Sequence, residues 1–123
     1  MANSRSAALY KIALEQAIKN VKIISDANLP IALGTDSGIQ ARFPGYFEHM
    51  ELWMMVDAGL TPSDALLSAT SVAANCLDLD DRGSLVAGRW ADFIVFDENP
   101  LEDIQATRSI ESVYIAGEKV SEN

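Results

Sequence analysis

The sequence predicts an α/β fold, and three observations carry the prediction. The run from Pro30 to Leu33 is apolar throughout, and a strand that is apolar on both faces is typical of a parallel sheet covered by helices. Helical patterns fill the first two-thirds of the 123 residues, and short β-rich segments fill the last third. A chain of this length is one domain by the usual prior and buries roughly two-thirds of its unfolded surface.

The first predicted element is a long amphipathic helix over residues 6–27. Its apolar side chains recur at spacings of three and four and share one face. They are Leu9, Ile12, Ala13, Ala17, Val21 and Ile24. Asn28 is a plausible stop because asparagine tolerates the left-handed conformation of a helix end.

Two further helices follow the predicted strand. Residues 46–58 form the first, closed by Gly59. The second runs over 62–77, with Thr61 as its N-cap and Pro62 at its first position. Cys76 lies in this apolar stretch and is expected to be a buried small hydrophobe.

After Asp80 the helical pattern gives way to short β-rich segments. Strands are expected over 92–97 and 110–116, with a return through 117–120. A further short segment lies between Gly83 and Gly88, flanked by glycines. The chain is therefore divided into residues 1–80 and 81–123.

Composition excludes some classes of function. The net charge of −9 argues against nucleic acid, because phosphate binding needs clustered Lys and Arg, and the nine basic residues are scattered. No apolar stretch approaches the ~18 residues that span a bilayer. The N-terminus lacks the apolar core of a secretory signal, so a cytoplasmic location is expected.

The most informative motif is Gly34-Thr35-Asp36-Ser37, which directly follows the apolar run. A carboxylate at the C-terminal end of a buried strand is well placed for metal chemistry. A catalytic metal normally needs several ligands, and the chain has one histidine, His49, and one cysteine. By itself, the motif is better explained as a strand-to-loop turn capped by the aspartate.

Four segments of the chain form a recognisable series. The first is Gly34-Thr35-Asp36-Ser37-Gly38, and the second runs from Glu51-Leu52 to Thr61-Pro62. The third runs from Ala65-Leu66 to Thr70 and Ala73, and the fourth from Gly83-Ser84-Leu85 to Asn99-Pro100-Leu101. In this order and spacing they resemble the C-terminal part of the metal-dependent amidohydrolase superfamily, closest to its imidazolonepropionase-like and Xaa-Pro dipeptidase-like branch.

The resemblance implies a fold and a size. The family fold is a (β/α)8 barrel beside a small β-sandwich, and the barrel alone needs roughly 250 residues. Residues 1–80 would then be the C-terminal part of the barrel: its helix 7, its strand 8 and the closing helices. Residues 81–123 would be the C-terminal strands of the β-sandwich.

The resemblance also implies a role for Asp36, as a metal ligand and as the general base that takes a proton from metal-bound water. The cofactor that the resemblance implies for the intact enzyme is a divalent metal, with zinc as the expected ion. Its other ligands in the family are histidines and often a carboxylated lysine, on strands that this chain lacks. This chain alone is expected to bind none. His49 and Glu51 are two apart on a helix, so they point to different faces and make no two-ligand clamp. His49 is interpreted as structural or solvent-facing, and Glu51 as a helix-packing carboxylate with a hydrogen-bonded partner. In the intact enzyme, Arg42 or Tyr46 could line the mouth of the active-site pocket.

The function these observations favour is a fragment of a metal-dependent hydrolase acting on C–N bonds, inactive as an isolated chain. The substrate of the intact enzyme would be a small-molecule amide, dipeptide or cyclic amide. The alternative is a non-catalytic interaction module, or a subunit that completes a barrel with another chain. Because a lone barrel strand exposes unpaired edges, homo-oligomers are expected. A self-sufficient metalloenzyme would need ligands from several copies.

Overall fold

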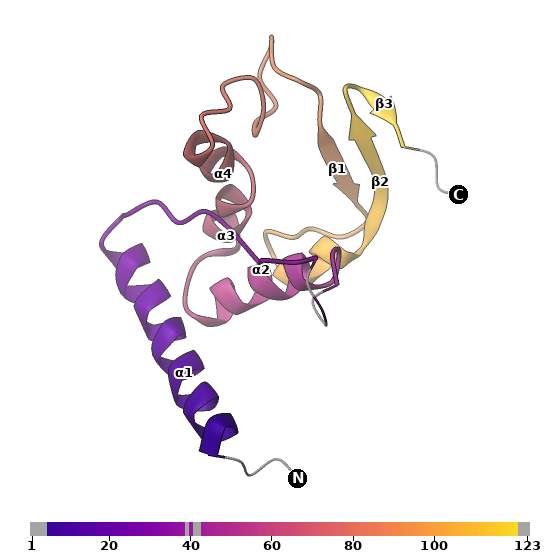
Figure 1. Ribbon diagram of the computed structural model, residues 1–123. Coiled ribbons are helices and arrows are strands. Elements are labelled where there is room, and N and C mark those ends of the chain that lie inside the picture. The colour runs from indigo at the N-terminus through magenta and orange to yellow at the C-terminus, as the bar shows by residue number, and fades with distance from the viewer. Residues whose placement is uncertain (1–4, 39, 41–42, 121–123) are drawn as a thin grey trace.

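The computed structural model describes residues 5–38, 40 and 43–120 (Figure 1). Four α-helices come first: α1 (Arg5–Asp26), α2 (Phe47–Asp57), α3 (Pro62–Ser68) and α4 (Ser71–Cys76). They are followed by strand β1 (Phe93–Phe96), the 3-10 helix η1 (Ile104–Arg108), and strands β2 (Ile110–Ile115) and β3 (Glu118–Lys119). Within these ranges, no helix combines the length and the apolar character needed to cross a bilayer.

Helix α1 forms as expected, but most of its apolar face is uncovered. Its N-terminal half extends away from the other elements (Figure 1), and the side chains of Leu9 and Ile12 are 59% and 63% exposed. Val21, near the other end, is partly buried against the core. The helix stops at Asn28, whose φ of 55° confirms the left-handed ending.

The strand expected over residues 30–33 is absent. These residues are extended but belong to no sheet, and Leu33 N–H donates to Ser68 O at 3.0 Å. A strand needs a hydrogen-bonded neighbour, and the described ranges provide none beside this segment. The sheet that this chain does form is antiparallel. The place of residues 30–33 in a parallel barrel stays a prediction.

The core lies between α2, α3 and η1. Its buried members are Leu52, Met55, Leu60, Ala65 and Ile104. Ile31 and Leu33 of the extended segment pack against this cluster. The segment that leads to Asp36 is therefore held by apolar contacts to the helices.

The predicted helix over 62–77 is two helices. Thr61 caps α3 as expected, its Oγ1 accepting from the Asp64 N–H at 3.1 Å. The break falls at Thr70, whose φ and ψ of −124° and −98° are not helical and whose hydroxyl donates to Leu66 O. Cys76 is exposed rather than buried, because it ends α4 and the buried residue of that helix is Ala74.

The last third forms an antiparallel sheet of order β1-β2-β3. Phe93 pairs with Tyr114 and the two rings stack with centroids 4.4 Å apart. The expected strands at 92–97 and 110–116 are confirmed within a residue or two, and the return strand is short. No strand forms between Gly83 and Gly88, which are turns and bends in the structure.

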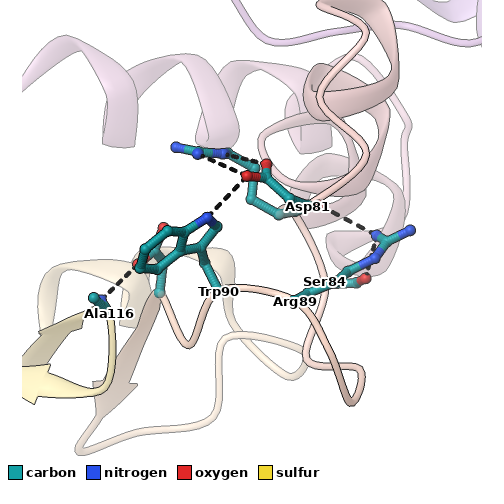
Figure 2. Close-up of polar contacts among 7 residues, drawn as sticks. Asp81, Ser84, Arg89, Trp90 and Ala116 are labelled. Carbon is teal, nitrogen blue, oxygen red and sulfur yellow. Dashed lines mark hydrogen bonds and ion pairs between the residues drawn. The ribbon is translucent and has the colours of Figure 1, made fainter.

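A network of polar contacts holds the segment that connects α4 to β1 (Figure 2). Asp81 accepts from Trp90 Nε1 at 2.8 Å and from Arg82 Nε at 2.9 Å, and its carbonyl accepts from the Trp90 N–H. The Arg82 hydrogen bond is the main cause of the lowered pKa of the Asp81 carboxyl. Arg89 donates to Ser84 Oγ at 2.7 Å. The division of the chain after residue 80 stays a prediction.

Candidate functional site

Asp36 follows the extended segment, residues 30–35, and lies on the side of the segment that faces solvent. Exposure alternates along the segment: Ala32, Gly34 and Asp36 are exposed, whereas their odd-numbered neighbours are half-buried against the helices. The φ of Asp36 is 53°, a left-handed conformation that residues other than glycine rarely adopt. The backbone therefore turns sharply at the carboxylate proposed from the sequence.

The residues on either side of Asp36 are tied to helix α2 through Glu48. Thr35 Oγ1 donates to Glu48 Oε1 at 3.0 Å, and the Gly45 N–H donates to Glu48 Oε2. Ser37 Oγ lies 2.7 Å from Thr35 Oγ1. The Ser37 backbone N–H also donates to Thr35 Oγ1, at 3.2 Å.

These hydrogen bonds favour the ionised form of Glu48. The pKa of its carboxyl is lowered, first by a hydrogen bond with its own backbone N–H and next by the Ser37 hydroxyl. Sequence reasoning missed this role. A glutamate in the first turn of a helix is a common signal with many meanings, and its partners lie 13 and 3 residues away.

His49 does not take part in the Glu48 network and contacts η1 instead. Its Nδ1 lies 3.0 Å from Thr107 Oγ1 of η1. The pKa of the His49 imidazole is lowered, chiefly by burial and then by the charge of Arg108. Glu51 is half-buried and burial raises the pKa of its carboxyl, but within the described ranges it has no hydrogen-bond partner, contrary to expectation.

The described residues do not make a metal site. No group of three or more His, Cys, Asp or Glu side chains among them could hold an ion. Asp36 fits such a site as one ligand, and the remaining ligands must come from elsewhere. Its role as ligand and base stays a prediction.

An open pocket of about 400 Å³ lies between α2 and η1. It is lined by Gly45, Tyr46, His49, Met50, Trp53, Gln105 and Arg108, and Asp36 is not among them. Tyr46 therefore lines a pocket, but not one that includes Asp36, and Arg42 lies outside the described residues. The sequence offered no signal for this pocket, because η1 was not expected and Arg108 is remote from α2 in the chain.

The sequence profile of the Amidohydrolase family matches residues 3–120, so the chain belongs to this family. It is 34% identical over 106 residues to the adenine deaminase of Ligilactobacillus salivarius, covering 85% of this chain and 17% of that enzyme. It is 33% identical over 102 residues to the imidazolonepropionase of Christiangramia forsetii, covering 79% of this chain and 25% of that enzyme.

A similar solved structure is that of a Xaa-Pro dipeptidase with bound methionine in the active site, at a TM-score of 0.78 and 30% identity. The match covers 88% of this chain and 26% of that chain. The resemblance to the imidazolonepropionase- and dipeptidase-like branch is confirmed. The chain spans a quarter or less of the curated relatives named above, and family membership implies a piece of a barrel enzyme.

Proposed function

We propose that this chain is the C-terminal part of a metal-dependent hydrolase that acts on C–N bonds, and that Asp36 contributes a carboxylate to its active site. Residues 30–33 would be the eighth barrel strand, α1 the seventh helix, and α2 to α4 the closing helices. The relatives include a deaminase, an imidazolonepropionase and a dipeptidase. A small-molecule amide, dipeptide or cyclic amide is accordingly the proposed substrate class.

The observation that carries the proposal is the setting of Asp36. Its left-handed backbone is flanked by Thr35 and Ser37, both held through Glu48, and its side chain is on the exposed side of the segment. Sparsely populated backbone conformations persist where the surroundings over-determine them, and they cluster at active sites. Ala32 and Gly34 share the open side, so small groups leave room beside the carboxylate.

The metal site would be completed by the rest of the enzyme. The superfamily generally uses divalent metals, and zinc is our proposal for this one. Because one carboxylate is a thin supply of ligands, the 123-residue chain alone is expected to be inactive. Isothermal titration with Zn²⁺ should detect no tight site in the isolated chain, and Asp36→Asn should leave the titration unchanged.

A chimaera tests the catalytic role. Residues 5–120 would replace the matching last quarter of the Xaa-Pro dipeptidase, and hydrolysis of a Xaa-Pro dipeptide would be followed. We expect activity, and a loss of at least about 100-fold in kcat on Asp36→Asn, the size typical of a removed general base. Asp57→Asn, an exposed aspartate at the end of α2, is the matched control. A folded, metal-loaded chimaera whose kcat is indifferent to Asp36→Asn would contradict the proposal.

A further inference from the structure

The pocket between α2 and η1 is lined by polar side chains and contains the guanidinium of Arg108. Tyr46, His49, Gln105 and Arg108 supply the polar side, and Met50 and Trp53 the apolar side. The Arg108 guanidinium makes no hydrogen bond or ion pair with any residue of the described ranges.

The proton on His49 can be placed from its partner. Thr107 Oγ1 donates its single hydroxyl proton to Ile104 O at 2.9 Å, and Thr107 is only 2% exposed. The contact at 3.0 Å between Thr107 Oγ1 and His49 Nδ1 therefore has the imidazole as donor. Neutral His49 then carries its proton on Nδ1, and Nε2 is left as a bare acceptor.

An anion in this pocket would change the state of His49. In the free protein, burial and then the Arg108 charge lower the pKa of the imidazole, while Glu48 acts in the opposite direction. A bound anion offsets the charge of Arg108 and offers an acceptor to an Nε2–H. Both effects favour the imidazolium, so one proton is taken up from solvent as the anion binds.

We propose that this pocket binds a small carboxylate that carries a flat apolar group, with Arg108 holding the carboxylate and His49 taking up a proton on binding. The guanidinium fork matches a carboxylate in two parallel hydrogen bonds. One permanent cation suits a monoanion better than a phosphate dianion. The ring of Trp53, 48% exposed at the pocket wall, offers a surface for the flat group. This inference does not rest on the role of Asp36.

Nuclear magnetic resonance of the 123-residue chain tests the proposal, since His49 is its single histidine and the imidazole signals need no assignment. In the free protein, the ring nitrogen shifts should show the Nδ1–H tautomer. Benzoate is the probe, titrated between pH 5.5 and 8. We expect the pKa of His49 to rise by about one unit at saturation, which corresponds to about tenfold tighter benzoate binding at the acid limit.

Arg108→Gln should abolish the benzoate-dependent shift, whereas Arg89→Gln, an arginine outside the pocket, should preserve it. Benzamide, the neutral analogue, should leave the His49 pKa unchanged. An unchanged pKa with benzoate would overturn the proposal, and so would a free imidazole in the tautomer mixture of a solvent-exposed ring. Equal shifts with inorganic phosphate would overturn the assignment to carboxylates.

Discussion

Asp36 combines a reactive carboxylate with an unfavourable backbone. Holding a residue other than glycine in the left-handed region costs roughly 1–2 kcal/mol, somewhat less for aspartate. The flanking hydrogen bonds of Thr35 and Ser37 offset this cost. A site that needs a fixed carboxylate gains from such a loop, because the direction of the side chain is set before any ligand arrives.

A pair of substitutions measures the backbone cost. Asp36→Gly and Asp36→Ala both remove the side chain and its contacts, so they differ in backbone freedom alone. The φ of 53° suits glycine, and we expect the glycine variant to be more stable by about 1 kcal/mol. Urea unfolding of the two variants at pH 7 measures the difference. An alanine variant as stable as the glycine variant would contradict the left-handed geometry.

Glu48 and Glu51 lie on the same helix and should respond to pH in opposite ways. The pKa of Glu48 is lowered on folding, so its contribution is complete above the unfolded value of 4.5 and is lost as pH falls through the folded value. The pKa of Glu51 is raised by burial, so its ionised form is disfavoured at neutral pH and relieved on acidification.

Glu48→Gln should therefore lower the melting temperature at pH 7, and Glu51→Gln should leave it unchanged or raise it. Both differences should shrink as the pH falls toward 3 and the carboxyl groups of the wild type take up protons. Thermal unfolding followed by circular dichroism at the two pH values provides the comparison. Equal and parallel responses of the two variants would show that the Thr35–Glu48 contact does not stabilise the loop.

Among single residues, the sequence singled out Asp36 as a candidate site residue but not the residues around it. Asp36 stands out because it follows an apolar run and sits in a recurring motif. Glu48 and Arg108 take their meaning from contacts between segments that are distant in the chain, and no local spacing encodes those contacts. The structural interpretation of His49 stays a prediction: its imidazole contacts Thr107 and lines the pocket with Arg108.

At the scale of elements, local signals predicted the helix ends well and the isolated strand badly. Thr61, Pro62 and Asn28 act within one turn, and their predicted effects are confirmed. The break at Thr70 was missed because apolar spacing continues through it. The strand at 30–33 requires neighbours to pair with, and apolar character alone cannot supply them.

The two threonines that precede α3 and α4 should contribute unequally. Thr61 caps α3 through the Asp64 N–H, whereas Thr70 makes no side-chain cap and donates to Leu66 O. Thr61→Ala should cost about 1 kcal/mol of unfolding free energy, and Thr70→Ala clearly less. Urea denaturation of both variants measures this. A larger loss for Thr70→Ala would contradict the capping geometry.

Gly83 allows the linker to pass close to α4. A Cβ at this position would lie 2.6 Å from Ala74 Cβ and 2.9 Å from Thr70 O, at a φ of +81°. Gly83→Ala should therefore destabilise by about 3 kcal/mol, combining the backbone and steric costs. Gly88 has a similar φ of +91° but open space around it, so Gly88→Ala isolates the backbone cost of about 1–2 kcal/mol. Equal losses of unfolding free energy in the Gly83→Ala and Gly88→Ala variants would exclude the close approach of Gly83 to α4.

The whole molecule has a small core and a large uncovered apolar surface. Leu9, Ile12 and Ile23 of α1 are each more than half exposed, and the core cluster holds five buried residues. In the proposed enzyme, the rest of the barrel would cover α1. In the isolated chain, that face is free to contact a second copy, as the expected homo-oligomer requires.

We expect the isolated chain to self-associate through α1. Replacing both Leu9 and Ile12 by Gln should shift the sedimentation profile toward monomer and change stability by less than about 0.5 kcal/mol, because both side chains are already exposed. Lys11→Gln and Glu15→Gln together change the same helix without removing apolar groups and provide the control. A wild-type chain that stays monomeric at high concentration would count against association.

The single backbone hydrogen bond that fixes residues 30–35, from Leu33 to Ser68, has a consequence for the order of folding. The helices α2 and α3 pack against each other and are joined by a short loop. Contacts between segments so close in the chain form early in folding. Within the described residues, the extended segment makes no other backbone hydrogen bond, and in the proposed enzyme its strand neighbours would come from more distant parts of the chain. In the longer enzyme, zipping this segment into the barrel would be a late step, and the carboxylate of Asp36 would reach its working position only when the ring closes.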